Sequence, residues 1–129
     1  MNIAAYSHEY IPPAPVLQVR IAIAGELPGG DQYSALIDTG ADGTFVPIAI
    51  LEEYELPILY MTNVRSHLGE RLHRVPIYKI DIILFDSILL PNIEVVGDDW
   101  GNHIILGRNV LNKLQLNLDG PNETTRVLG

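Results

Sequence analysis

The segment Ala35-Leu36-Ile37-Asp38-Thr39-Gly40-Ala41-Asp42 brings an aspartate to the end of an apolar run, directly before a glycine-containing turn. A carboxylate beside a buried strand is costly unless it has hydrogen-bond partners. Thr39 offers a hydroxyl, and Gly40 leaves room for a second backbone to approach. Aspartate and glycine are also frequent in ordinary turns, so this segment taken alone favours a purely structural turn.

A second segment, Ile104-Ile105-Leu106-Gly107-Arg108-Asn109-Val110-Leu111, follows the aspartate turn by about 65 residues and predicts an apolar strand, a glycine and a short helix. In these two segments the chain resembles the retropepsin-like aspartic proteases, the family of retroviral proteases and their cellular and bacterial relatives. Within that family it is most similar to the non-viral, bacterial-type members. The matching patterns are hydrophobic-Asp-Thr-Gly-Ala-Asp and hydrophobic-hydrophobic-Gly-Arg-Asn/Asp-hydrophobic-Leu. The resemblance extends over roughly residues 16–128.

The distribution of apolar residues predicts an all-β protein. Leu17, Val19, Ile21 and Ile23 alternate with more polar positions, which is the period of a strand. Further strands are expected at 32–37, 44–47, 60–66, around 78–82, and at 92–96, 104–106, 115–118 and 124–128, with helical turns at 48–54 and 108–114. The expected architecture is a closed or partly open acid-protease β-barrel with one short C-terminal helix, assembled as a homodimer.

The chain divides into an N-terminal arm and one domain. Pro12, Pro13 and Pro15 stiffen residues 1–15 and exclude regular helix, so we expect an arm there and a retropepsin-like protease domain over 16–129. One domain suits a length of 129 residues.

Composition narrows the classes of function. With 8 basic and 16 acidic residues the formal charge is −8, which disfavours nucleic acid and anionic membranes as partners. Charges and prolines interrupt every apolar stretch before it reaches the length of a membrane-spanning helix. There is no cysteine, so disulfides, thiolate metal sites and a cysteine nucleophile are excluded. The first ten residues show no secretory signal, and together these features predict a cytoplasmic protein.

The resemblance implies hydrolysis of peptide bonds by a water molecule held between two aspartates that share one proton. The chain has a single Asp-Thr-Gly, so the second carboxylate would come from Asp38 of a second copy across a twofold axis. The implied partners are therefore a second copy and a peptide or protein substrate. A non-catalytic dimerisation or peptide-binding module on the same fold is the alternative, because a fold does not fix a function.

The family also implies roles around Asp38. Thr39 would hydrogen-bond across the dimer axis, Gly40 would permit close approach of the two loops, and Ala41 and Asp42 would contact substrate. Arg108, after Gly107, would pair with Asp42 and hold the dimer loops; an ordinary surface ion pair is the competing interpretation. Gly43 stands where retroviral relatives often carry a polar residue, so substrate contacts there are expected to differ.

Two further segments correspond to substrate-covering elements of the family. His67, Leu68 and Gly69 occupy the position of the flap hairpin, although one glycine makes a stiffer flap than a glycine-rich hairpin would. Trp100, in the loop before the second motif, would contact an apolar substrate side chain; the alternative is that it covers the core. The four histidines lack metal-ligand spacing and no serine lies in a Gly-x-Ser-x-Gly context, so neither metal, other cofactor nor serine nucleophile is expected.

Overall fold

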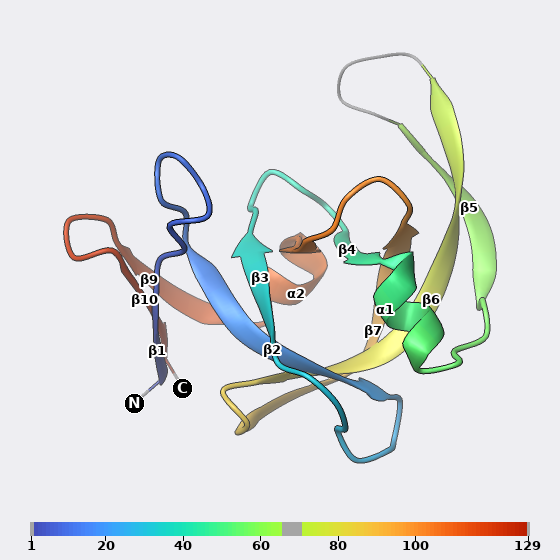
Figure 1. The fold of residues 1–129 in the computed structure, drawn as a ribbon, viewed down its shortest axis with the longest axis horizontal. Helices are drawn as coiled ribbons and strands as arrows, with labels where there is room; N and C mark the ends of the chain where they lie inside the picture. The colour runs from blue at the N-terminus through green and yellow to red at the C-terminus, as the bar shows by residue number, and fades with distance from the viewer. Residues whose placement is uncertain (1, 66–70, 129) are drawn as a thin grey trace.

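The computed structural model describes residues 2–65 and 71–128, which form ten strands and two short helices (Figure 1). The elements in order are β1 (Asn2–Ala5), β2 (Val16–Ile23), β3 (Tyr33–Ile37), β4 (Thr44–Pro47), α1 (Ile48–Glu53), β5 (Tyr60–Arg65), β6 (Leu72–Leu84), β7 (Ile88–Asp98), β8 (Ile104–Leu106), α2 (Arg108–Leu111), β9 (Gln115–Asp119) and β10 (Thr124–Leu128). The all-β prediction is confirmed.

Seven strands form one sheet in the order β2-β3-β8-β4-β7-β6-β5. Strand β2 also pairs with β6, with Ile21 opposite Ile82, and this pairing closes six of the strands into a barrel. The interior is filled by the alternating apolar side chains of β2, β6 and their neighbours, among them Leu17, Val19, Ile21, Val46, Ile80, Ile82, Leu84, Val95 and Leu106, all at most 1% exposed. Each such fully buried side chain contributes about 1.5–3 kcal/mol.

A buried carboxylate joins the connection after β2 to strand β7. Asp81 is 4% exposed and lies where the β6–β7 register shifts between Ile80 and Ile82. Its Oδ2 accepts the Gly25 N–H at 3.0 Å and its Oδ1 accepts the Asn92 N–H at 2.9 Å. Charge-assisted bonds from two backbone donors make a buried carboxylate tolerable. The irregularity also explains why β7 continues through Pro91, beyond the predicted 92–96, because proline is accepted at bulges.

The N-terminal segment is folded against the C-terminal strands. β1 pairs with β10, and β10 pairs with β9, forming a separate three-stranded sheet that brings the two chain ends together (Figure 1). The connection to β2 is held by a Ser7–Ala14 bridge and by a His8–Glu123 contact of 2.9 Å. Proline placement predicts an arm at 1–15 but does not reveal its partner strand.

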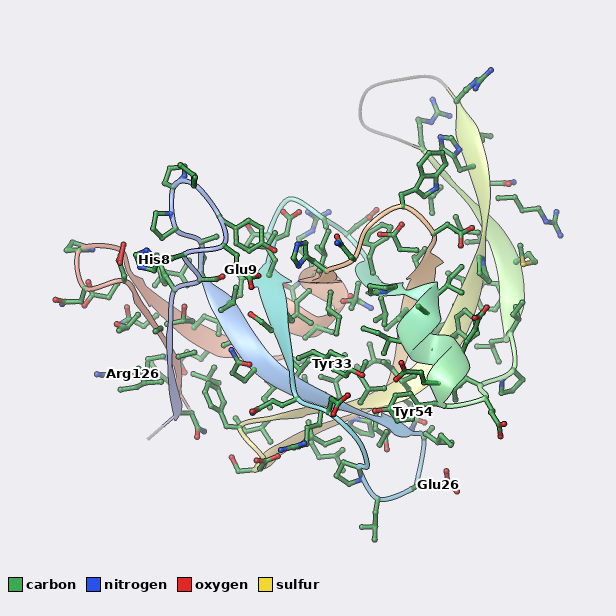
Figure 2. All side chains as sticks on the ribbon, in the orientation of Figure 1. His8, Glu9, Glu26, Tyr33, Tyr54 and Arg126 are labelled. Carbon is green, nitrogen blue, oxygen red and sulfur yellow. The ribbon has the colours of Figure 1, made fainter. Side chains whose placement is uncertain are left out.

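Both predicted helices exist, and the second is shorter than expected. α2 ends at Leu111 because the next amides form tighter turn bonds, with Lys113 N–H to Val110 O and Leu114 N–H to Leu111 O. α1 ends next to Tyr54, whose hydroxyl donates to the carbonyl of Gly29 at 3.1 Å and whose side chain is a neighbour of Tyr33 (Figure 2).

The β5–β6 hairpin extends beyond the barrel at the upper right of Figure 1. Its six cross-strand pairs run from Tyr60 opposite Ile77 to Arg65 opposite Leu72. No helix in the described part of the chain is long and apolar enough to cross a membrane.

Candidate active site

Asp38 emerges at the end of β3, where that strand lies parallel to β8 with Ile37 opposite Leu106. Its backbone N–H donates to the Leu106 carbonyl at 3.0 Å. Its half-buried carboxylate accepts the Gly40 N–H on Oδ1 at 2.9 Å. The two sequence motifs therefore meet here, and the Asp-Thr-Gly turn orients its own carboxylate without a bond from another element to that oxygen.

The start of α2 holds the loop that follows Asp38. The backbone N–H of Arg108 donates to the carbonyl of Ala41 at 2.8 Å, and that of Asn109 donates to the carbonyl of Asp42 at 3.3 Å. The Arg108 guanidinium adds a bond from Nη1 to the carbonyl of Thr39 at 2.9 Å. Three bonds therefore fix the loop from one short helix.

Arg108 and Asp42 of the same chain form no ion pair among the described residues. The contacts within 4.0 Å between basic and acidic side chains among residues 2–65 and 71–128 are His8–Glu123 and Arg20–Asp86. The Arg108 guanidinium donates to the Thr39 carbonyl, and the Asp42 side chain is exposed. Arg108 thus stabilises the loop by hydrogen bonds to the backbone carbonyls of the loop.

Thr44 and Asn109 form a buried link behind the loop that motif analysis does not reveal. The Thr44 hydroxyl donates to Asn109 Oδ1 at 2.7 Å and accepts the Gly107 N–H at 3.1 Å. Asn109 Nδ2 in turn donates to the Glu94 carbonyl of β7 at 3.0 Å. Thr44 is fully buried, and a threonine within an apolar strand next to the motif is the signal that could have indicated it.

Gly107 is required by space. Its backbone has a φ of −93°, which any residue adopts, but a Cβ there would lie 2.0 Å from the Gly43 carbonyl oxygen and 3.0 Å from that of Ala41. The absence of a side chain lets the second motif pass directly beneath the aspartate loop. Gly107 is therefore a structural residue of the site.

The exposed part of the loop includes the two residues predicted to meet a second copy. Thr39 and Gly40 are exposed, and Ala41 is half-buried. Asp38 borders neither of two surface hollows, one formed by Asn117, Asp119, Thr124 and Arg126 and the other by Pro47, Ile48, Ala49, Ile50, Glu52, Asp98, Asp99, Gly101 and Asn102.

Trp100 does not cover the core, since it is 85% exposed. The Asp98 carboxylate shapes its loop by accepting the Trp100 N–H at 2.9 Å and the Gly101 N–H at 3.2 Å. The indole lies edge-on to His73 of β6, with ring centroids 6.0 Å apart. The loop before β8 is thus in contact with the β5–β6 hairpin.

Two aromatic neighbours of this loop were not anticipated. His73 contacts Trp100, and Tyr10 of the N-terminal segment lies 5.6 Å from His103, measured between ring centroids. The predicted flap residues His67, Leu68 and Gly69 lie outside the described residues, although the strands that carry them, β5 and β6, are formed.

Comparisons with known proteins agree on the architecture. No protein-family profile and no curated protein sequence matches the chain. A retropepsin-like aspartic protease from Rickettsia conorii superposes with a TM-score of 0.65 at 11% identity, covering 97% of this chain and 87% of the other. The simian foamy virus (mac) protease gives 0.53 at 22% identity, covering 75% and 91%. The retroviral protease-like domain of Ddi1 from Leishmania major gives 0.50 at 15% identity, covering 89% and 95%.

These similarities are in fold, with aspartic proteases among the structural neighbours. The barrel, the placement of Asp38 at the end of β3 and the helix after Gly107 agree with the expectation drawn from the two motifs. The chain therefore has the retropepsin-like fold.

Proposed function

We propose that the chain is an aspartic endopeptidase that acts as a homodimer, with Asp38 of each copy supplying one carboxylate. The observation that carries the proposal is the position of Asp38 at the end of β3, with Oδ1 held by the Gly40 N–H and the backbone held by Leu106. Preorganised carboxylates of this kind serve general acid–base chemistry.

The reaction follows from two carboxyl groups that share one proton. The ionised carboxylate removes a proton from water while the water oxygen attacks the scissile carbonyl carbon, and the protonated partner donates its proton to the carbonyl oxygen. The resulting gem-diol collapses when one hydroxyl loses its proton and the amide nitrogen gains one, which breaks the C–N bond. Two peptides leave, and no covalent intermediate forms. A shared proton favours activity from acidic to near-neutral pH.

The requirement for a dimer follows from the count of aspartates. The sequence contains Asp-Thr-Gly once, so one chain offers half of the catalytic pair. Exposure of Thr39 and Gly40 leaves the turn available to a twofold partner, and the bond from Arg108 to the Thr39 carbonyl would keep the turn in shape at that contact.

The substrate would lie extended across the two turns. Ala41 and Asp42 would contact its backbone, and the exposed Trp100 would meet an apolar side chain. The absence of cysteine is compatible with activity in a reducing compartment such as the cytoplasm.

The test is cleavage of a peptide library by the wild type, by Asp38→Asn and by Asp31→Asn, an exposed aspartate away from the turn. We expect Asp38→Asn to lose about 10³-fold or more in kcat/KM and Asp31→Asn to behave as wild type. Mixing wild type with excess Asp38→Asn should reduce activity with the square of the wild-type fraction, because mixed dimers lack one carboxylate. Undiminished cleavage by Asp38→Asn would refute the proposal.

A non-catalytic peptide-binding module is the second candidate, favoured by the single glycine between Val64 and Val75. A statine-type transition-state mimic discriminates between the two functions. An enzyme should bind the mimic far more tightly than a peptide of the same sequence, whereas a binding module should bind both alike.

A further inference from the structure

The β5–β6 hairpin has a free edge. β5 is the last strand of the seven-stranded sheet and pairs with β6 alone, so its outer backbone groups have no strand partner among the described residues. Edge strands of this kind accept extended segments as an additional strand. The hairpin also stands away from the barrel, which leaves that edge accessible (Figure 1).

The hairpin is basic in an acidic protein. Residues 60–77 contain three of the eight basic side chains and one of the sixteen acidic ones, a formal charge of +2. The rest of the chain carries −10. Such a separation attracts an acidic ligand to the hairpin and repels it from the remaining surface.

Two arginines of the hairpin share one face. Arg65 lies opposite Leu72 and Arg74 lies opposite Asn63, so the two arginines are diagonal neighbours on adjacent strands, about 7–8 Å apart at the backbone. Both are exposed, and neither lies within 4.0 Å of a carboxylate among the described residues. Like charges this close repel each other, so an acidic ligand would relieve a local cost.

The same face carries exposed apolar surface. Leu72 is 56% exposed and Met61 is 39% exposed, and the pairing register places both beside the arginines. The opposite face holds His73 against Trp100. The arginine face therefore combines two cations, apolar surface and a free strand edge.

We propose that this face selects extended substrate segments in which acidic side chains alternate with apolar ones. An added strand places every second side chain on the arginine face, where its carboxylates meet Arg65 and Arg74. The intervening apolar side chains of that strand lie on the opposite face, which carries His73 and Trp100. The description of the ligand as a substrate rests on the proposed function; its binding does not, because no catalytic residue takes part.

The test measures binding in the Asp38→Asn background, so that cleavage cannot interfere. The probe is a fluorescent peptide in which Glu alternates with Val and Leu, compared with the same peptide carrying Lys in place of Glu. The altered protein is Arg65→Glu/Arg74→Glu, and the matched control is Lys113→Glu/Arg126→Glu, whose residues lie outside the hairpin. In the Asp38→Asn background both double variants have a formal charge of −11, so a difference between them reports position and not net charge.

We expect the unaltered hairpin to prefer the Glu peptide, with affinity falling as salt is added. Arg65→Glu/Arg74→Glu should weaken binding about tenfold, whereas the control pair should change it by less than about twofold. If the charge reversal impairs folding, Arg65→Gln/Arg74→Gln should still weaken binding about threefold. Equal affinity for the Glu and Lys peptides, or equal losses in both double variants, would overturn the inference.

The same protein variants also distinguish two other possible occupants of the arginine face, a nucleic acid and a second copy of the chain. Binding of a single-stranded oligonucleotide as tight as that of the Glu peptide would assign the face to phosphate and overturn the inference. Loss of self-association in Arg65→Glu/Arg74→Glu alone, measured by sedimentation, would also overturn the inference, since it would assign the face to a second copy.

If Asp38→Asn keeps its preference for the Glu peptide but the wild type cleaves neither peptide, the proposed function fails and this inference stands. If the wild type cleaves both peptides equally and Asp38→Asn binds them equally, the proposed function stands and this inference fails.

Discussion

The hydroxyl of Thr44 donates a 2.7 Å hydrogen bond to Oδ1 of Asn109, joining two segments 65 positions apart behind the candidate catalytic aspartate. The same hydroxyl accepts the N–H of Gly107. One fully buried oxygen thus connects the loop that follows Asp38 with the helix that holds it.

Replacing Thr44 by valine should destabilise the fold by about 1–3 kcal/mol, because the buried N–H of Gly107 and Oδ1 of Asn109 would lose their partner. Urea unfolding measures the change. Thr125 is the matched control, since it is equally buried but its hydroxyl has no hydrogen-bond partner in the described structure. Thr125→Val should be neutral or stabilising, and an equal loss in both variants would contradict the assigned role of Thr44.

Gly107→Ala should be among the most damaging single substitutions in the second motif. A Cβ 2.0 Å from the Gly43 carbonyl oxygen cannot be accepted without moving the aspartate loop, so we expect a loss of about 3 kcal/mol or more. Thermal unfolding checks this. At Gly120 a Cβ meets nothing within 4 Å, so Gly120→Ala should leave the midpoint within about a degree or raise it.

Asp81→Asn should destabilise the barrel by about 1–3 kcal/mol, since an amide offers one acceptor oxygen where the carboxylate serves both Gly25 and Asn92. Hydrogen exchange at these two amides is the direct measurement. Faster exchange at one or both is expected, with little change at the Asp38 turn. Unchanged protection at both amides would show that the carboxylate is not needed there.

Stability should fall at alkaline pH because of Tyr33. Burial raises the pKa of its hydroxyl to about 12, with further contributions from Tyr54, Glu53 and Asp31. The raised pKa favours the protonated form in the folded state, so this stabilisation is complete below the ordinary value of 10.0 and is lost as the pH rises through about 12. Tyr33→Phe should therefore show a smaller fall in unfolding midpoint across that window than the wild type. Parallel curves for the two proteins would contradict this assignment.

The fold class and the position of Asp38 could be predicted because they depend on local pattern. Alternating apolar residues such as Leu17, Val19 and Ile21 require a half-buried strand wherever they occur. The two motifs are continuous segments, so their presence needs no knowledge of distant contacts. The helix at Arg108 was predicted for the same reason, and its end was misplaced because the last turn is decided by backbone bonds.

The sequence by itself determined an all-β chain with one aspartate at the end of an apolar strand and a glycine that precedes a short helix. Only the tertiary structure decided that Arg108 holds the Thr39 carbonyl and not Asp42, that Thr44 is buried between the motifs, and that residues 2–5 pair with the last strand. Those contacts join backbone groups or distant segments. A backbone carbonyl is the same in every residue, so which one a side chain reaches depends on chain geometry and not on residue type.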